Sequence, residues 1–300
     1  MMLIRKGTGE DPLLIEKNKV SYLEFEALKK QSWLTHAFST RLGGVSSGCF
    51  ASMNLGFGRG EEDKIVAENY KRLGDAVGFD WKKVVLSHQT HTTNVRLVTE
   101  KDAGKGTVRE RDYTDVDGLI TNEPGLPLVT FYADCVPLYF ADPKNKAIGL
   151  SHSGWRGTVG RMGEKTLKAM NEAFGTQPQD VIAAIGPSIC GDCFEVGPEV
   201  VEEFAKTFSK KQMESICHAG RDDRSYLDLW QANRIILEEA GVQPQNISVT
   251  NICTRCNPNL LYSHRIMGAQ RGNLAANFND KGRKSEKYSQ FFMTKRKGQL

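Results

Sequence analysis

Apolar residues recur at helical spacing in several segments of the chain. In residues 62–77 they fall on one face, and Gly78 can end the helix that this pattern predicts. Helical spacing also predicts a helix over residues 227–240, while end signals predict a helix over residues 158–174, which stops before Gly175, and one over residues 198–208, which begins with Pro198. Each of these helices has an apolar face that must pack against another element, so the chain is expected to fold in layers.

Shorter apolar runs between these segments are typical of strands. They cover residues 36–39, 84–86, 95–98, 118–121, 128–132, 147–151, 181–185 and 247–250. Helices and strands are interspersed, but they do not alternate regularly as in a doubly wound fold. The pattern therefore predicts an α+β or α/β layered sandwich, with mixed β-sheets flanked by helices.

Composition and charge indicate one large folded domain followed by a basic tail. The 300 residues are 39% hydrophobic and 25% charged, as in ordinary globular proteins. We find no linker-like stretch and no repeat, which favours a single domain over residues 1–276 and a tail over residues 277–300. Residues 271–300 contain eight basic residues and two acidic ones. Such a tail is more often a solvated terminus than a nucleic-acid arm, so nucleic acid is not an expected partner.

Other global features predict a cytoplasmic protein. The N-terminus turns polar after four residues and has no apolar core of a secretory signal. The longest apolar stretch, residues 124–141, contains three prolines and Asp134, so it cannot be a membrane helix. Seven scattered cysteines are an odd number and argue against a disulfide framework. The oligomeric state is left open.

Three residues at the ends of predicted strands form a candidate metal site. They are His91, Cys135 and His152. Two imidazoles and one thiolate suit zinc, which with three protein ligands keeps a fourth position open for water. Copper also accepts this set of ligands. No short motif joins the three residues, so by spacing alone each of them could equally be a packed side chain.

Two C-x-x-C pairs form a second group of candidate ligands. They are Cys190 with Cys193 and Cys253 with Cys256. The spacing within each pair suits a four-cysteine zinc site, but the separation of about 60 residues is longer than usual. We therefore take packed free cysteines as the simpler interpretation.

Several motifs in one order make the sequence similar to the YfiH family, also called polyphenol-oxidase or laccase-domain proteins. Gln89-Thr90-His91 matches the family position of a ligand, so the resemblance selects His91 rather than His88. The matching motifs are Phe38–Gly44, Gln89–His91, Asp117–Thr121, Ala133–Pro137, His152–Gly157, Gly186-Pro187, Cys253-Thr254 and Ser263–Arg265.

The resemblance implies the fold, the cofactor and the reaction. The family fold resembles the catalytic domain of cytotoxic necrotizing factor, a bacterial toxin. The implied cofactor is zinc, with copper as the other choice, held by His91, Cys135 and His152. The implied reactions are phosphorolysis of adenosine, inosine, guanosine and methylthioadenosine, and deamination of adenosine. The expected partners are therefore a purine nucleoside and phosphate.

Further roles follow from what these reactions need. Cys135 and His152 are expected to be catalytic as well as ligating, and Asp134 is a candidate proton shuttle. Arg41 and Arg156 are candidate phosphate clamps, because a guanidinium offers paired donors, although each could be a surface ion pair instead. Trp155 is a candidate platform for the base.

Three alternatives use the same residues differently. Cys135 and His152 could form the dyad of a metal-free cysteine hydrolase. A copper site could oxidise phenols, although a chain with six histidines and no His-x-His pair lacks the paired motifs of multicopper oxidases. A binding protein could keep the metal as a structural element.

Overall fold

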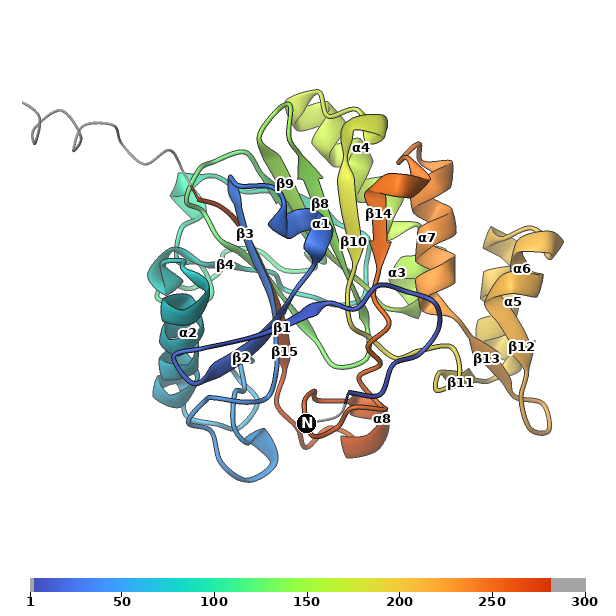
Figure 1. Ribbon diagram of the computed structural model, residues 1–300, viewed down its shortest axis with the longest axis horizontal. Coiled ribbons are helices and arrows are strands. Elements are labelled where there is room, and N and C mark those ends of the chain that lie inside the picture. Colours follow the sequence, from blue (N-terminus) through green and yellow to red (C-terminus); the bar gives the residue numbers. More distant parts are fainter. Residues whose placement is uncertain (1–2, 282–300) are drawn as a thin grey trace, which may run out of the picture.

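Two six-stranded sheets form the centre of the computed structural model, which describes residues 3–281 (Figure 1). Both sheets are mixed, with antiparallel pairs in the middle and a parallel pair at one or both edges. The first sheet has the order β1 (Leu13–Lys17), β2 (Val20–Glu24), β3 (Leu34–Ser39), β15 (Leu274–Asp280), β7 (Leu128–Tyr132), β4 (Val85–Leu86). The second has the order β14 (Ile247–Val249), β10 (Ile182–Ile185), β8 (Val136–Asp142), β9 (Ala147–Ser153), β6 (Gly118–Thr121), β5 (Val95–Leu97).

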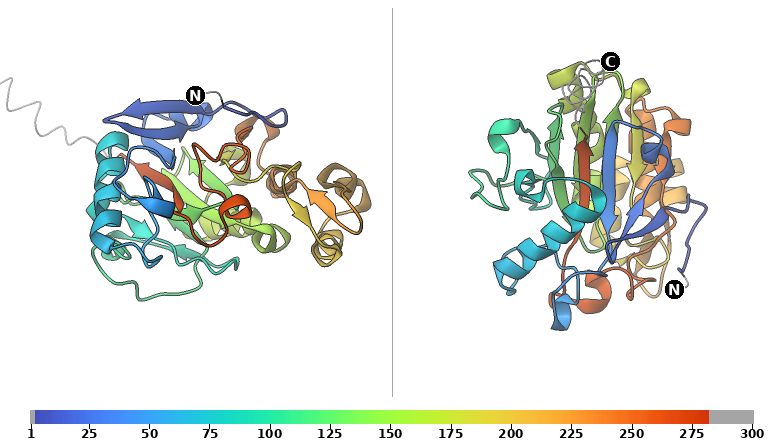
Figure 2. Two further views of the ribbon diagram at one scale, coloured as in Figure 1. Left: turned by 90° about the horizontal axis from the view of Figure 1, so that it is seen from below. Right: turned by 60° about the vertical axis from the view of Figure 1, so that its left-hand side comes forward.

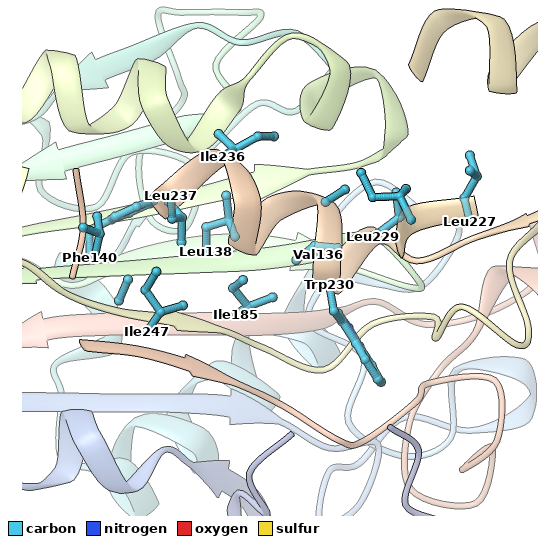
Figure 3. Close-up of a cluster of buried hydrophobic side chains, with 14 of the residues drawn as sticks. Val136, Leu138, Phe140, Ile185, Leu227, Leu229, Trp230, Ile236, Leu237 and Ile247 are labelled. Atoms are coloured by element: carbon cyan, nitrogen blue, oxygen red, sulfur yellow. The ribbon is translucent and has the colours of Figure 1, made fainter. Parts of the chain in front are cut away.

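The two sheets pack face to face, and helices cover their outer faces (Figure 2). Between the sheets, Phe38 and Phe278 of the first pack with Tyr139 and Leu150 of the second. Helix α2 (Asp63–Val77) covers the first sheet. Helices α4 (Met162–Phe174) and α7 (Leu229–Glu239) cover the second, where Leu237 lies over Leu138 (Figure 3). The result is a four-layer sandwich.

Smaller elements lie around the sandwich, and residues 195–227 form a lobe beside α7 (Figure 1). None of the helices in residues 3–281 combines the length and the apolar character that crossing a membrane requires. The smaller elements are α1 (Glu26–Lys29), α3 (Trp155–Val159), α5 (Pro198–Thr207), α6 (Lys210–Ile216), α8 (His264–Met267) and a sheet of β11 (Glu195–Val196), β13 (Ser225–Leu227) and β12 (Cys217–Ala219).

The predicted layered sandwich with mixed sheets is confirmed, and so is the helix that ends at Gly78, whose φ of +100° is left-handed. The helix predicted over residues 158–174 is instead two helices, α3 and α4. Arg161 breaks them apart, because its own φ of +59° is also left-handed. A helical apolar pattern continues across this break, so spacing alone could not show it.

The predicted domain boundary at residue 276 falls inside β15. This strand is buried over its whole length and pairs with β3 on one side and β7 on the other. It was not predicted as a strand because Asn277, Asn279 and Asp280 interrupt its apolar run. The fold therefore extends to Asp280, and residues 282–300 of the predicted basic tail lie outside the described residues.

A buried histidine in the first sheet makes the stability of the fold depend on pH. His36 in β3 accepts a hydrogen bond from the Phe25 backbone N–H at Nε2, at 2.8 Å. Burial, together with the charges of Lys29 and Lys281, lowers the pKa of His36 to about 3. The folded state therefore holds this imidazole neutral, whereas the unfolded chain protonates it below a pH of about 6.5.

We expect His36 to destabilise the fold as the pH falls below about 6.5. Between pH 7 and pH 5 its share of the loss is about 2 kcal/mol of unfolding free energy, because only the unfolded state gains the proton. Urea unfolding at several pH values measures this loss. The His36→Gln variant keeps an acceptor but cannot be protonated, so its curve should be flatter. Parallel pH curves for the two proteins would contradict this assignment.

Candidate metal centre

The three predicted ligands come together where the ends of the two sheets meet. His91 lies in the loop after β4, Cys135 lies in the turn from β7 to β8, and His152 lies near the end of β9. Their ligand atoms all lie within 4.8 Å of one another. The Cys135 Sγ is 4.0 Å from the His91 Nε2, and the two imidazole rings are 5.0 Å apart between centroids. His88 is not part of this group.

Asp117, immediately before β6, holds two of these candidate ligands in place. Its carboxylate is fully buried and lies 2.8 Å from the His152 Nδ1. The same carboxylate accepts hydrogen bonds from the backbone N–H groups of Thr90, His91 and Thr92. Because Nδ1 is bound in this way, the Nε2 of His152 is the nitrogen left to bind a metal.

The protonation of the trio reflects its close packing. Burial raises the pKa of the Cys135 thiol, but the neighbouring His152 and His91 outweigh burial and bring that pKa down to about 6. Burial lowers the pKa of His152, but Cys135 and Asp117 outweigh it and raise that pKa to about 9. Cys135 is therefore readily a thiolate, which is the form that binds metals and the form that acts as a nucleophile.

Gly154 leaves the space that the trio needs. A Cβ added at this residue would lie 3.1 Å from both the Cys135 Sγ and the His91 Cδ2. These contacts are tighter than ordinary van der Waals separations, so any larger residue would push against two of the ligands at once. Gly154 is also the residue that precedes α3, where the chain turns away from the end of β9.

A cavity of about 420 Å³ opens beside the trio. That volume suits a small molecule. Three arginines line the cavity, namely Arg59, Arg111 and Arg271, whereas no carboxylate is among the described residues that line it. Burial and the nearby Arg59 lower the pKa of Arg271 to about 10, so Arg271 stays charged at neutral pH. The aromatic and imidazole side chains in the lining, apart from His91 and His152 of the trio, belong to Phe57, His88, Phe131, Tyr132 and His264.

The predicted substrate-binding residues lie elsewhere. The Arg41 guanidinium donates to the backbone carbonyls of Ala51 and Pro258, so it ties loops together. The Arg156 guanidinium lies over the Trp155 ring, 4.2 Å from its centroid. None of Arg41, Arg156 and Trp155 lines the cavity. The sequence motifs that contain these residues lie in loops around the site. The motifs did not show which side chains point into the cavity.

Asp134 is placed as an anchor between loops. One of its carboxylate oxygens accepts from the Thr254 hydroxyl at 2.6 Å, and the other accepts from the Arg265 backbone N–H at 2.7 Å. Its own φ is +87°, a left-handed conformation that these bonds support. The carboxylate is thus engaged away from the cavity, whose lining does not include it.

Two positioning residues were missed by the sequence analysis. Asp117 was noted only as part of a motif, and Gln89 only as the residue that precedes His91 in a motif. The Gln89 side chain accepts from the Phe131 backbone N–H and donates to the Phe131 carbonyl, at 2.7 and 2.8 Å. The Gln89 side chain therefore joins the His91 loop to β7 through a pair of hydrogen bonds like those between neighbouring strands. Their presence within matched motifs was the one feature that pointed to them.

Sequence and structure comparisons both relate this chain to known proteins. A family described as multi-copper polyphenol oxidoreductase laccase matches residues 35–278. Purine nucleoside phosphorylase YlmD of Bacillus subtilis is 37% identical over 76% of this chain and 82% of its own. Adenosine deaminase RL5, from an unknown prokaryotic organism, is 34% identical over 79% of this chain and 90% of its own. The crystal structure of the hypothetical protein YfiH of Bacillus licheniformis aligns with a TM-score of 0.81 and 29% identity, over 87% of this chain and 96% of that one.

The role of Asp117 can be tested through metal affinity. We expect Asp117→Asn to weaken zinc binding by about 10- to 100-fold, because an amide holds the His152 ring and the His91 loop less firmly than a carboxylate does. Competition with a zinc-binding dye measures the change. Asp115→Asn is the matched control, since the exposed Asp115 carboxylate accepts from the neighbouring Thr90 hydroxyl rather than from a candidate ligand. Equal affinities for both variants would remove Asp117 from this role.

Proposed function

The chain belongs to the multi-copper polyphenol oxidoreductase laccase family, and we propose that it is a metal-dependent enzyme of purine nucleosides. The predicted resemblance to the YfiH family is confirmed by the family match and by the shared fold. The prediction of an enzyme agrees with relatives that are named as a purine nucleoside phosphorylase and an adenosine deaminase. The proposed reactions are phosphorolysis of the glycosidic bond and deamination of adenosine.

One observation carries the proposal. The trio of His91, Cys135 and His152 opens into a cavity that contains three arginines and several aromatic rings. A nucleoside has an aromatic base, which aromatic side chains can stack against, and its phosphorolysis needs an anion beside the sugar. The cavity therefore offers a place for each part of the substrates next to a reactive centre.

The donor set fits zinc. Two imidazole nitrogens and a thiolate within 4.8 Å of one another can share one ion, and Cys135 is readily deprotonated. When bound, zinc would supply Lewis-acid activation of water or of a polar substrate group. Asp117 orients His152, and Gly154 keeps the trio free of crowding.

The arginines are the proposed phosphate subsite. Arg271 is the most suitable, because it lies close enough to Cys135 and Asp134 for their charges to act on its pKa. It is held in place by bonds from its Nη1 to Gly272 and Asn273. In phosphorolysis a phosphate oxygen forms a bond to the ribose C1′ while the bond from C1′ to the base nitrogen breaks. Deamination of adenosine does not need this anion subsite.

A metal-free thiol hydrolase is the second candidate function. It is favoured by the protonation of the trio, since the lowered pKa of Cys135 and the raised pKa of His152 describe a thiolate beside an imidazolium. The same pair would carry out covalent catalysis without an ion. The two functions differ in their response to chelators, which should stop only the metal-dependent enzyme, whereas alkylation of Cys135 should impair both because Cys135 is also a proposed ligand.

Metal dependence is tested by assays on adenosine, inosine, guanosine and methylthioadenosine, with and without phosphate. We expect a chelator to abolish turnover and zinc to restore it, whereas His91→Ala should lose activity that zinc does not restore. His88→Ala is the matched control, because His88 lies outside the trio, so its turnover should still be lost to a chelator and restored by zinc. Activity that survives chelation but not alkylation of Cys135 would support the hydrolase. Oxygen uptake with phenols after copper loading would support an oxidase.

The phosphate subsite is tested by separating the two reactions. We expect Arg271→Gln to raise the KM for phosphate by about 10- to 100-fold, the cost of losing charge-assisted hydrogen bonds. Deamination of adenosine should change much less, and Arg271→Lys should recover part of the phosphorolysis. Arg156→Gln is the matched control outside the cavity. A larger effect of Arg156→Gln than of Arg271→Gln would return the phosphate to the residue chosen from sequence.

A further inference from the structure

A second group of thiols lies away from the cavity, at one end of the second sheet. Strands β10 and β14 are parallel neighbours in register from Ala183 with Ile247 to Ile185 with Val249. Each strand leads after a few residues into a C-x-x-C pair, so the two pairs emerge side by side. The four Sγ atoms all lie within 4.8 Å of one another. The cysteines of this group are Cys190, Cys193, Cys253 and Cys256.

The spacing of these sulfurs suits one metal ion. In a tetrahedral site with zinc–sulfur bonds of about 2.3 Å, neighbouring sulfurs lie about 3.8 Å apart. Here the Cys193 Sγ is 3.5 Å from the Cys256 Sγ, too far for a disulfide bond, and all four thiols are free. A cluster of several iron atoms would need the thiolates farther apart, because iron and sulfide lie between them.

Backbone N–H groups and an arginine contact this group of thiols. The Cys190 backbone N–H donates to the Cys253 Sγ at 3.3 Å, and the backbone N–H of Cys193 closes a tight turn onto the Cys190 carbonyl at 2.9 Å. The Arg255 Nη1 lies 3.3 Å from the Cys193 Sγ and offsets negative charge. Three of the thiols are buried, whereas Cys256 is partly exposed and gives access to the group.

We propose that Cys190, Cys193, Cys253 and Cys256 form a second metal centre, a structural tetrathiolate site for one zinc ion. Four protein ligands leave no open coordination position, so this centre is structural rather than catalytic. It is separate from the trio of His91, Cys135 and His152, and it does not depend on the proposed reaction.

The centre would fasten the loops that support the turn carrying Cys135. The Ile189 backbone N–H, next to Cys190, donates to the Asp134 carbonyl at 3.0 Å. The Thr254 hydroxyl, next to Cys253, donates to the Asp134 carboxylate at 2.6 Å. Both loops of the second centre therefore hold Asp134, which precedes Cys135. Zinc at the second centre would therefore hold the turn that carries Cys135 in place through these two loops.

Zinc content of the full-length chain, measured by elemental mass spectrometry, tests the proposal. We expect Cys193→Ser with Cys256→Ser to lose one zinc per chain relative to the unmodified protein. Cys49→Ser with Cys217→Ser is the matched control, because these two cysteines lie outside both groups, and it should lose none. His91→Ala with Cys135→Ala should keep the zinc that the Cys193/Cys256 variant loses, so failure of the first site does not affect this test.

A second measurement serves if the Cys193/Cys256 variant does not fold. Cysteine alkylation in the unmodified protein is mapped by mass spectrometry before and after treatment with a strong chelator. We expect the four thiols to react only after chelation, whereas exposed Cys49 reacts in both cases. The proposal is overturned by thiols that react equally before and after, by disulfides between these cysteines in freshly purified protein, or by equal zinc in the variant and its control.

Discussion

The buried carboxylate of Asp117 is the constraint on which the candidate metal centre depends. A carboxylate without exposure to water is costly unless its charge is balanced and its oxygens are bonded. Here the three backbone donors of residues 90–92 and the His152 ring satisfy it together. These interactions lower the pKa of Asp117 in spite of its burial. The bonds that stabilise the charge are therefore the same bonds that set the positions of two ligands.

The arrangement of the sheets brings the third ligand to this point. Strand β7 belongs to the first sheet and β8 to the second, so the turn between them passes from one layer to the other. Cys135 lies in this turn, and Asp134 beside it binds loops from residues 254 and 265. The cavity is lined by residues from both sheets and their loops, and two of its arginines that are distant in sequence meet there because the Arg59 side chain donates to the backbone carbonyls of Ala269 and Arg271.

The layered architecture, the family and the three converging residues were all predictable from the order of the amino acids. Apolar periodicity depends on local burial, so it predicted α2 and strands such as β7 and β9. The chemistry of imidazole and thiolate ligands, with the motif around Gln89, identified His91, Cys135 and His152. Periodicity did not reveal β8 or β15, because Pro137 in the first and buried asparagines in the second do not follow a strand pattern.

Which side chains line the same cavity depended on how the loops pack in three dimensions. Arg41 and Arg156 carry the same charge as Arg271, but the directions of their loops, which no local pattern encodes, keep them out of the cavity. For the C-x-x-C pairs, the three-dimensional structure brought together residues that the sequence had not predicted to meet. Their separation of about 60 residues argued against a shared site, yet the parallel pairing of β10 with β14 places them together. Residues that are far apart in the sequence can become close neighbours once a sheet has formed, because strand pairing brings distant segments side by side.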